Sequence, residues 1–386
     1  MNNIPYGRQD VNDEDIKAVI EVLRSDFLTQ GPMVPAFEST VANYCGAKYA
    51  IAVNSATSAL HLSCLALNVK KGDIVWTSPI SFVASANCAL YCGATIDFVD
   101  INPKTYNLDL EALSRKLELA KKYNKLPKIV IPVHLAGQSC DMEGIFKLSL
   151  KYGFKIIEDA SHAIGGKFKN EPIGNCQFSD ITIFSFHPVK IITTGEGGMA
   201  LTNNLELNKK MCLLRSHGIN REPEEMRFAQ EGSWYYEQTD LGYNYRMTDI
   251  QAALGISQMS RIDFFVNKRN QIASKYNRAF ENTILIAPWQ DNNYSAFHLY
   301  VVRLPQRDKK NNRNEVFEGL RQKGIQVNIH YIPIYHHPYY KKMNFNALDF
   351  PEAELYYKEA ISLPIYPSLS DAQQNEVIDK LLKLYS

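Results

Sequence analysis

The sequence has no long apolar run, and this absence sets the first limits on what the chain can be. No stretch approaches the ~18 residues of a membrane-spanning helix, and residues 1–8 lack the apolar core of a signal peptide. The chain also lacks an excess of charge of one sign, with 42 Lys plus Arg against 41 Asp plus Glu. A balanced charge gives nothing global that attracts nucleic acid or an anionic membrane. We therefore expect a soluble, cytoplasmic protein with a small-molecule partner.

Cysteines are scattered rather than grouped, which argues against a disulfide framework and against a structural metal. The seven cysteines are odd in number and mostly flanked by apolar residues, as is typical of reduced thiols in a cytosolic core. Cys88 and Cys92 could share a helix face, but no second pair or nearby histidine completes a zinc site. We expect no bound metal.

Repeats and low-complexity tracts are also absent, so the organisation is predicted from hydrophobic periodicity. Apolar residues at helical spacing predict a helix that ends at Leu23, with Asn12 or Asp13 as its N-cap. Helix-like stretches then separate six β-rich runs: Ala50–Val53, Ile74–Thr77, Thr95–Val99, Ile129–Val133, Lys155–Ile157 and Ile181–Phe186. This alternation predicts an α/β fold with a mainly parallel central sheet between helices. Ligands of such sheets bind at the carboxyl ends of the strands.

The length of 386 residues, 45% of them hydrophobic, favours two domains. We predict a large cofactor-binding domain over residues 1–260 and a small α+β domain over 261–386; the N-terminal segment could pack on the small domain. In the small domain we expect a long helix after Ser260 and four further elements. These are strands at His298–Leu304 and near Gln326–His330, and helices at Glu352–Ile361 and Asp371–Leu384.

Lys190 follows an apolar strand and lies between the hydroxyl of Ser185 and the glycine-rich turn Gly195–Gly198. A lysine amine that is shielded from water loses basicity and can form a Schiff base with an aldehyde. Pyridoxal phosphate is the usual such aldehyde. We interpret Lys190 as a lysine of covalent catalysis, although a lone lysine is more often a surface charge.

Asp159 and His162 follow the end of another buried strand. A carboxylate beside the pyridine nitrogen of pyridoxal phosphate raises the pKa of that nitrogen and keeps it protonated, which suits Asp159. Taken alone, Asp159 is more typical of a helix N-cap. His162 either reaches the cofactor or is simply a polar residue that opens the next helix.

The segment Val53–Leu62 reads as a strand, a turn of small hydroxyl residues and a helix. The backbone N–H groups of Ala56, Thr57 and Ser58, the Thr57 hydroxyl and the helix dipole could bind a phosphate. A structural N-cap explains the same residues. Phe82 comes just after another strand and could stack on a flat ring, although by itself it would be assigned to the core.

These clues follow one another in a fixed order: phosphate turn, stacking aromatic, acid at a strand end, hydroxyl, lysine. In this order the chain resembles the sugar aminotransferases of the DegT/DnrJ/EryC1 family over nearly its whole length. The matching segments are Gly31-Pro32, Asn54–Thr57, Phe98–Ile101, Glu158–Ala160, Phe184–Lys190, Gly195–Gly198, Arg215–Gly218 and Asn244–Met247. The resemblance implies the type I fold of pyridoxal-phosphate aminotransferases.

The resemblance also implies roles for the matched residues. Lys190 matches the lysine that carries pyridoxal phosphate and moves protons between the cofactor and sugar C4. Asp159 matches the partner of the pyridine nitrogen, and Phe82 matches the aromatic that stacks on the ring. Some of the family replaces this lysine by histidine and deoxygenates sugars, and Lys190 argues against that branch.

Further matched positions concern the phosphate and a second subunit. Ala56, Thr57 and Ser185 match residues that bind the phosphate, and His162 matches a glutamine or histidine in contact with the cofactor. Asn244 matches an asparagine that reaches the phosphate held by the neighbouring subunit. A homodimer with shared active sites is therefore implied.

Within the family, the chain is similar to the aminotransferases of pseudaminic acid synthesis. The matching segments are Ile4–Gln9, Leu28–Gly31, Asn54–Leu60, Pro79–Ala84, Ile192–Thr194 and His330–Tyr335. Such enzymes use L-glutamate to aminate C4 of UDP-2-acetamido-2,6-dideoxy-beta-L-arabino-hex-4-ulose, giving UDP-4-amino-4,6-dideoxy-N-acetyl-beta-L-altrosamine. The positions implied to line this substrate are Tyr6, Phe27, Leu28, Thr29, His330 and Tyr331.

Other activities stay open at this point. Glu158–Ala160 and His187-Pro188 look more like the broader family, so the substrate could be another UDP-linked 4-keto-6-deoxy sugar, of D configuration. A pyridoxal-phosphate lyase or dehydratase on the same scaffold is a second alternative, and a non-catalytic cofactor-binding protein is a third. Arg246 is a candidate cation for the glutamate carboxylate, or equally for an ion pair between subunits.

Overall fold

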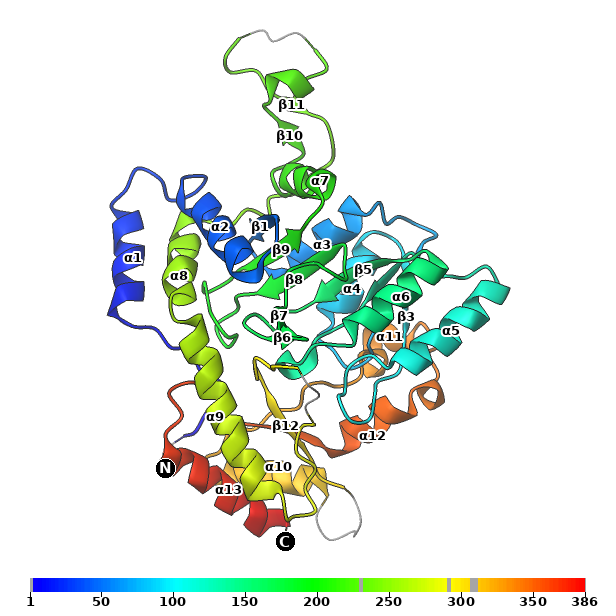
Figure 1. Ribbon diagram of the computed structural model, residues 1–386, viewed down its shortest axis with the longest axis vertical. Helices are drawn as coiled ribbons and strands as arrows, with labels where there is room; N and C mark the ends of the chain where they lie inside the picture. Colours follow the sequence, from blue (N-terminus) through cyan, green and yellow to red (C-terminus); the bar gives the residue numbers. More distant parts are fainter. Residues whose placement is uncertain (1–2, 229–231, 290–292, 306–311, 386) are drawn as a thin grey trace.

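The computed structural model describes residues 3–228, 232–289, 293–305 and 312–385. Its centre is a seven-stranded sheet with the order β1-β9-β8-β5-β4-β2-β3 (Figure 1). The strands are β1 (Tyr49–Val53), β2 (Ile74–Thr77), β3 (Thr95–Phe98), β4 (Ile129–Ile131), β5 (Lys155–Asp159), β8 (Ile181–Ser185) and β9 (Gly198–Thr202). Only β9 runs antiparallel to its neighbours, so the mainly parallel sheet predicted from the sequence is confirmed.

The two faces of the sheet pack against different helices because side chains alternate along each strand. One face, with Ile51, Ile157 and Ile183, shares a core cluster with α3 (Ala56–Ala66), α4 (Ala84–Tyr91) and α7 (Leu205–Arg215). The other face packs against α2 (Met33–Cys45) and α8 (Asp249–Met259) at one end, and against α5 (Leu110–Lys122) and α6 (Met142–Tyr152) at the other. The result is three layers with the sheet in the middle.

A long helix, α9 (Ile262–Phe280), joins this body to the C-terminal elements. The early α9 residues Phe265 and Val266 pack in one core cluster with α2 and α8, whereas the later residues Tyr276 and Phe280 pack in another. The proposed division at residue 260 thus falls just before α9. The C-terminal elements are β12 (Tyr300–Arg303), α10 (Arg313–Gln322), α11 (Pro338–Lys341), α12 (Pro351–Glu359), β13 (Ala360–Leu363) and α13 (Asp371–Tyr385).

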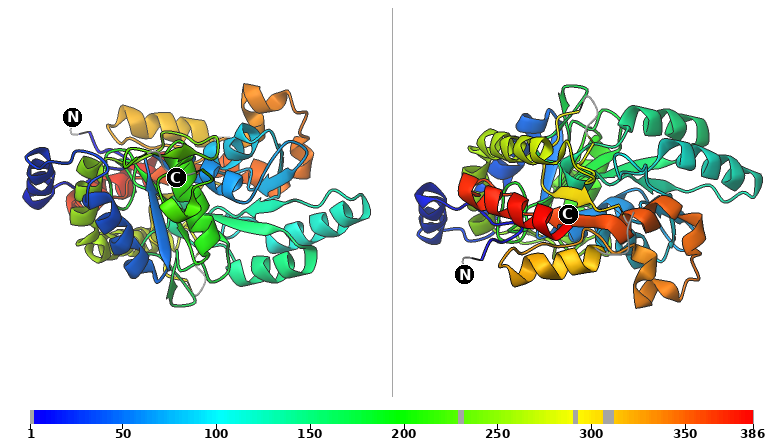
Figure 2. Two further views of the ribbon diagram at one scale, coloured as in Figure 1. Left: turned by 90° about the horizontal axis from the view of Figure 1, so that it is seen from above. Right: turned by 90° about the horizontal axis from the view of Figure 1, so that it is seen from below.

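The N-terminal segment lies against these C-terminal elements rather than against the sheet. Ile4 forms a β-bridge with Ile325 and is fully buried in the same cluster as Tyr276. The chain then enters α1 (Asp13–Leu23), whose N-cap is Asn12 with Asp15 completing a capping box. In both views of Figure 2, α1 and α5 lie at opposite sides of the molecule.

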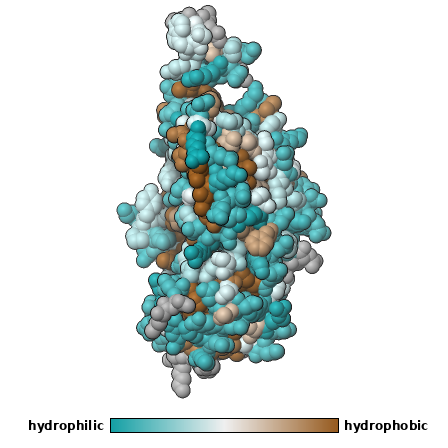
Figure 3. Space-filling model, turned by 90° about the vertical axis from the view of Figure 1, so that its left-hand side faces the viewer, coloured by the Kyte–Doolittle hydropathy of each residue, from teal (hydrophilic) through white to brown (hydrophobic). Residues whose placement is uncertain are grey.

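Two parts of the surface stand away from the body. A two-stranded arm, β10 (Ile219–Asn220) and β11 (Glu237–Gln238), projects beyond α7 (Figure 1). Along α1 and the turn after it, large apolar side chains are exposed, and Figure 3 shows apolar surface on this side of the molecule. They are Ile16, Ile20, Leu23, Phe27 and Leu28. The remaining short elements are β6 (Lys167–Phe168), β7 (Glu171–Pro172) and the 3₁₀ turns Leu135–Gly137, Pro223–Glu225, Ile334–His336 and Ala347–Asp349.

Some predicted elements differ from the structure. The expected strand near Gln326–His330 is wrong as a strand, because this segment makes only an isolated bridge between Asn328 and Ser362. The helix expected to run to Ile361 ends at Glu359, and Ala360–Leu363 instead pairs with β12. Strand β9 was not expected, because its start in Gly198 reads as the end of a glycine-rich turn. None of the helices in the described ranges has both the length and the apolar character needed to cross a membrane.

Candidate active site

A cavity of about 410 Å³ opens at the edge of the sheet where β1, β2, β5 and β8 end. Carboxyl ends of parallel strands are where α/β sheets bind ligands. Most of the residues singled out from the sequence line this one cavity: Tyr6, Ala56, Thr57, Phe82, Asp159, His162, Ser185, Lys190, His330 and Tyr331. The structure therefore brings together side chains that are up to 325 positions apart (331 − 6) in the chain.

Lys190 sits on the loop that connects β8 to β9. Both ends of the loop are fixed, because Phe186 donates its N–H to the Gly197 carbonyl (2.9 Å) and Thr194 donates to the Phe186 carbonyl (3.0 Å). Burial lowers the pKa of the Lys190 amine to about 8, against the opposing pull of the Asp159 carboxylate. The amine is thus partly neutral near physiological pH, as a nucleophile or base must be.

Asp159 ends β5, and its carboxylate is held by two serines. Ser85 Oγ donates to one carboxylate oxygen (2.6 Å) and Ser161 Oγ donates to the other (2.6 Å). The Ser161 backbone N–H also points to the carboxylate (3.2 Å), and Ser81 Oγ lies 2.7 Å from Ser85 Oγ. No helix begins at this point, since residues 161–165 form turns, so the N-cap alternative for Asp159 is wrong. The two serines hold the Asp159 carboxylate in a fixed orientation, and the carboxylate lines the cavity.

His162 is a neutral imidazole whose ring orientation is fixed by contacts at both nitrogens. Burial, and then the charge of Lys190, lower its pKa well below the usual value. Its Nδ1 accepts the Ala136 backbone N–H (3.3 Å), so Nε2 carries the hydrogen and faces the Tyr331 hydroxyl at 3.1 Å. His162 does not open a helix, because turns follow it. The ring of His298 lies 4.4 Å from that of His162 and also lines the cavity.

The phosphate turn predicted from the sequence is the first turn of α3. Ser55 is the N-cap and accepts the Ser58 N–H (3.1 Å). The N–H groups of Ala56 and Thr57 have no carbonyl four residues earlier within the helix, so they are available to an anion, and the helix dipole favours negative charge there.

Gly198 packs directly on this turn. A Cβ atom at Gly198 would lie 2.4 Å from the Ala56 nitrogen, so no side chain fits between β9 and α3. Gly198 also pairs with Ser185 in the sheet, which brings the Ser185 hydroxyl beside the same turn. The glycine-rich stretch seen in the sequence therefore has a steric cause.

Aromatic and histidine side chains form the remaining wall. Phe82 is 59% exposed and faces the cavity, with its ring centroid 6.3 Å from that of Tyr331. The ring of Tyr6 lies 5.5 Å from that of His330, whose Nδ1 pairs with the Ser362 hydroxyl (2.8 Å). Burial lowers the pKa of His330 to about 3, so His330 adds no positive charge to this wall.

Other predicted site residues lie outside this cavity. Phe27, Leu28 and Thr29 are exposed on the turn after α1, and Thr29 forms a bridge with Thr248. Asn244 is exposed and forms a bridge with Ser216. Arg246 lines a separate hollow at the base of the arm. None of these residues lines the Lys190 cavity of this chain.

The structure adds residues that the sequence gave little reason to choose. Ser85 and Ser81 lie in a run of small residues that reads as ordinary helix, and His298 is a single histidine far from any motif. The four-residue spacing of Ser81 and Ser85 was the only available signal for these two serines. His298 gave none.

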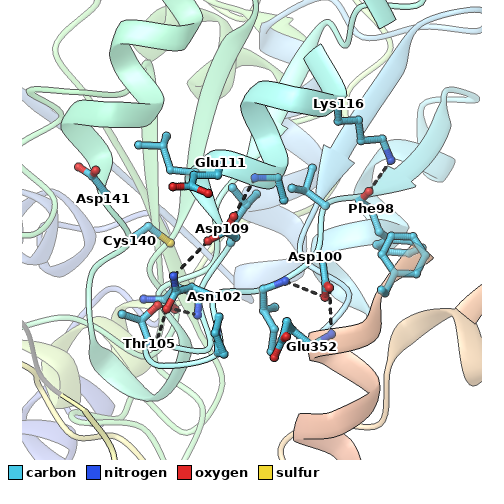
Figure 4. A pocket seen from close by; sticks show the side chains of 18 of the residues that line it. Phe98, Asp100, Asn102, Thr105, Asp109, Glu111, Lys116, Cys140, Asp141 and Glu352 are labelled. Atoms are coloured by element: carbon cyan, nitrogen blue, oxygen red, sulfur yellow. Dashed lines mark hydrogen bonds between the residues drawn. The ribbon is translucent and has the colours of Figure 1, made fainter. Parts of the chain in front are cut away.

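A second and larger hollow of about 1680 Å³ lies beyond the far end of the sheet, between α5 and α12 (Figure 4). Two of its carboxylates hold the starts of helices. Asp100 accepts the N–H groups of Glu352 and Ala353 at the start of α12 (3.0 Å each), and Asp109 caps α5 through the Ala112 N–H (2.7 Å). These acids hold helices in place and leave little charge directed at a ligand.

The comparisons with known proteins agree with this geometry. The profile of the DegT/DnrJ/EryC1/StrS aminotransferase family matches residues 9–382. The spore coat polysaccharide biosynthesis protein SpsC of Bacillus subtilis is 40% identical over 97% of this chain and 95% of its own. A UDP-4-amino-4,6-dideoxy-N-acetyl-beta-L-altrosamine transaminase of Campylobacter jejuni is 38% identical over 99% of this chain and 97% of its own.

Solved structures show the same fold. PseC of Helicobacter pylori, an aminotransferase involved in the biosynthesis of pseudoaminic acid, superposes with a TM-score of 0.90 at 34% identity, over 100% of this chain and 99% of its own. A sugar aminotransferase of Streptococcus pneumoniae in its PLP-form has a TM-score of 0.88 at 29% identity, over 99% of this chain and 98% of its own. The fold predicted from the resemblance, that of the type I pyridoxal-phosphate aminotransferases, is confirmed.

Proposed function

The chain belongs to the DegT/DnrJ/EryC1/StrS family of pyridoxal-phosphate-dependent sugar aminotransferases, and from this premise we propose its substrates. The proposed reaction moves the amino group of L-glutamate to C4 of UDP-2-acetamido-2,6-dideoxy-beta-L-arabino-hex-4-ulose. The product is UDP-4-amino-4,6-dideoxy-N-acetyl-beta-L-altrosamine, in pseudaminic acid biosynthesis. The similarity to the Campylobacter transaminase and to PseC supports this choice of sugar.

One observation supports the chemistry above all others: a lysine amine of lowered pKa shares a small cavity with a carboxylate that two serines hold in place. The cavity also fits the remaining parts of pyridoxal phosphate. The α3 N-terminus, closed by Gly198, suits the phosphate, and the exposed face of Phe82 suits a flat ring. We propose that Ala56, Thr57 and Ser185 bind the phosphate, and that Asp159 and His162 hold the ring.

When bound, pyridoxal phosphate supplies an electron-accepting ring that allows an amino group and a proton to be exchanged between two carbonyl carbons. The protein's part is to position and to move protons. The Asp159 carboxylate, fixed by Ser85 and Ser161, holds a proton on the ring nitrogen. Lys190 Nζ, with a pKa of about 8, accepts a proton from the donor carbon and returns one to sugar C4. The side from which Lys190 approaches C4 sets the configuration of the new amine.

We also propose that the active form is a homodimer in which Asn244 reaches the phosphate bound by the other subunit. Asn244 is exposed and does not meet Lys190 within one subunit. Apolar side chains exposed along α1, together with Trp234 and Phe228 near the end of the arm, form surface of the kind that partner subunits cover. In such a dimer Arg246 would bind the glutamate carboxylate or pair with the partner. The seven free cysteines fit a cytoplasmic location.

Tyr6, His330 and Tyr331 line the cavity wall and are the proposed sugar-binding residues of the same subunit. Phe27, Leu28 and Thr29 are proposed to approach the sugar from the exposed turn after α1. This proposal needs a second subunit or a bound substrate, because the turn does not line the Lys190 cavity.

A different UDP-linked 4-keto-6-deoxy sugar, of D configuration, is the second candidate substrate. The chain is 40% identical to SpsC, a protein of spore coat polysaccharide biosynthesis, and 38% identical to the Campylobacter altrosamine transaminase. Sequence identity therefore does not single out the altrosamine sugar, and the second candidate stays open. A lyase or dehydratase would release product without a second substrate.

The deciding experiment incubates the enzyme with L-glutamate and a panel of UDP-4-keto-6-deoxy sugars. We expect one equivalent of 2-oxoglutarate per amino sugar, and a 4-amino product of L-altro configuration by NMR. A D-configured product would replace the proposed sugar by the second candidate. Turnover without 2-oxoglutarate would establish a lyase instead.

A further inference from the structure

Helix α8 packs against the segment that carries Lys190. This segment, residues 186–197 between β8 and β9, is named the Lys190 loop. In Figure 1, α8 lies between α1 and the central sheet. Gln251 and Gln258 are seven positions apart on α8, so both side chains lie on the same face of the helix. This face is the one that meets the Lys190 loop.

Three contacts join this face to the loop. Gln251 Nε2 donates to the Glu196 carbonyl (2.8 Å), and Gln258 Oε1 accepts the Thr193 N–H (3.4 Å). Between the two glutamines, a Cβ atom at Gly255 would lie 2.9 Å from the methyl carbon of Thr194, so the missing side chain lets helix and loop approach closely. The loop also lines the active-site cavity, whereas no residue of α8 does. Helix α8 therefore supports the loop from outside the cavity.

The amide of Gln258 is 1% exposed and also contacts the N-terminal segment. Its Nε2 donates to the Asp10 carbonyl (2.8 Å) and to the Asp15 carboxylate (2.7 Å). The two aspartate oxygens can only accept and the Thr193 N–H can only donate, so one orientation of the amide satisfies all three. A buried amide is unfavourable unless it is hydrogen-bonded, and an apolar side chain would fill the same space. These three bonds are what glutamine adds at this position.

Asp15 gives this contact a fixed anchor on α1. Its side chain is fully buried, and it accepts the Ser257 hydroxyl (2.6 Å) and the Arg261 guanidinium (2.6 Å) as well as Gln258. Arg261 also binds the Asp10 carboxylate (2.7 Å). The start of α1 and the end of α8 are thus held together by paired charges, and Gln258 extends this network to the Lys190 loop.

We propose that Gln251 and Gln258 are positioning residues for Lys190: they hold the Lys190 loop on α8, and Gln258 also ties it to Asp15. This inference rests on the proposed role of Lys190. Burial lowers the pKa of the Lys190 amine, so the amine keeps that pKa only while the loop excludes water from it. A loop released from α8 would admit water, and the pKa of Lys190 would rise toward its ordinary value.

Replacing a neutral glutamine by a neutral methionine changes none of the charges near Lys190. Asp159 raises the pKa of Lys190, while burial and then the Lys190 charge lower the pKa of three histidines. The ionisable side chains that surround the amine or line the cavity with it are Tyr6, Asp159, His162, His187, Glu196, His298, His330 and Tyr331, with Asp10, Asp15 and Arg261 behind the loop. A shifted pKa of Lys190 would therefore report access of water.

The first test measures hydrogen exchange, by mass spectrometry, in the peptide that covers the Lys190 loop of the full-length holoenzyme. Gln258→Met keeps the volume but removes the bonds to Thr193, Asp10 and Asp15, so exchange in this peptide should become about tenfold faster or more. The matched control, Ser257→Ala, also removes a bond to Asp15 but leaves Gln258 in place. It should speed exchange in α1 and leave the loop unchanged. Unchanged loop exchange in Gln258→Met, or the same increase in Ser257→Ala, overturns the proposal.

A second variant covers the case in which Gln258→Met does not fold. Gln251→Glu keeps an acceptor for the Thr248 N–H at the start of α8 but loses the N–H donated to the Glu196 carbonyl. Its loop peptide should also exchange faster than that of the unaltered enzyme. An unchanged rate in Gln251→Glu contradicts the support of the loop by α8.

The second test follows the capture of pyridoxal phosphate by the cofactor-free enzyme across pH. In Gln258→Met the pH midpoint of the capture rate should rise by about one unit, and the rate at pH 7 should fall about tenfold. Ser257→Ala should keep the midpoint of the unaltered enzyme, although both variants should lose stability in urea. A midpoint that stays the same in Gln258→Met would show that the loop does not depend on this contact.

Borohydride reduction of the unaltered holoenzyme, followed by peptide mass spectrometry, separates this inference from its premise. We expect the cofactor label on Lys190. Label on another residue would overturn both the role of Lys190 and the inference. Label on Lys190, together with unchanged exchange and midpoint in Gln258→Met, would overturn the inference alone.

Discussion

The Lys190 cavity and the larger hollow between α5 and α12 both contain lysines and aspartates, but these side chains have different surroundings in the two places. In the larger one, between α5 and α12, Asp97 pairs with Lys116 (2.8 Å), and Asp100 and Asp109 accept backbone N–H groups at helix starts. In the smaller one, no ion pair joins Lys190 to Asp159, and burial lowers the pKa of the neighbouring His162 and His330. Size and acidity alone would have selected the larger hollow as the candidate site. We choose the smaller hollow as the candidate active site because its lysine and its aspartate are not neutralised by an ion pair with each other.

The largest effect that separates the two hollows is expected from their lysines. Lys190→Ala should lower kcat for amino transfer by about 10³-fold or more, since it removes the proton carrier and the point of covalent attachment. The absorbance of covalently bound cofactor should vanish. Lys116→Ala is the matched control in the larger hollow and should keep both activity and absorbance. Cofactor that remains covalently attached in Lys190→Ala would refute the assignment.

The next contrast compares two aspartates. Asp159→Asn keeps the shape and the serine contacts but removes the charge, so kcat should fall about 10²-fold or more while the fold stays intact. Asp109→Asn, in the larger hollow, should leave kcat unchanged and lower the free energy of unfolding by at most about 1 kcal/mol. Steady-state kinetics and urea unfolding of both variants measure this. Equal losses of kcat would show that the two hollows do not differ as described.

A pH titration sharpens the same contrast. Lys190 must be neutral to attack an aldehyde, and its pKa is lowered to about 8. The rate at which the cofactor-free enzyme captures pyridoxal phosphate should therefore rise about tenfold per pH unit below 8 and then level off. Stopped-flow absorbance measures this rate. A rise that continues to pH 10 would mean that Lys190 is not desolvated.

The smallest expected effect on catalysis concerns Asp100, which lines the larger hollow and accepts hydrogen bonds from the start of α12. Asp100→Ala removes the acceptor of two N–H groups at the start of α12 and should lower the free energy of unfolding by about 1–2 kcal/mol. The kcat and KM for amino transfer should not change. Denaturant unfolding and steady-state kinetics check both parts, and a raised KM would mean that the larger hollow contributes to substrate binding.

Much of the fold could be predicted because buried parallel strands leave runs of apolar residues. All six predicted strands of the sheet are present. Strand β9 was missed because it starts in Gly198, whose small size serves packing on α3 rather than a turn. The segment near Gln326–His330 has the composition of a strand, but it forms only an isolated bridge with Ser362. Composition does not reveal whether a neighbouring strand is present to pair with.

The candidate site was predictable where its residues stand at strand ends and in motifs, as Lys190, Asp159 and Ala56 do. Ser85 and His298 were missed because their roles arise from tertiary packing, and their own sequence neighbourhoods resemble ordinary core. Asn244 and the turn at Phe27–Thr29 stay predictions, because they do not meet Lys190 within one subunit.

The contact between Gly198 and the Ala56 nitrogen gives the cavity a fixed length. Gly198 lies eight residues after Lys190 (198 − 190), at the start of β9 where the anchored loop ends, and it packs closely on the turn proposed for the phosphate. The separation between the Lys190 backbone and that turn is therefore set by backbone packed against backbone, and the lysine side chain spans what remains. The cavity therefore favours a ligand whose aldehyde and anionic group are separated by a particular distance. An aldehyde with its anionic group one bond too near or too far would engage one end only.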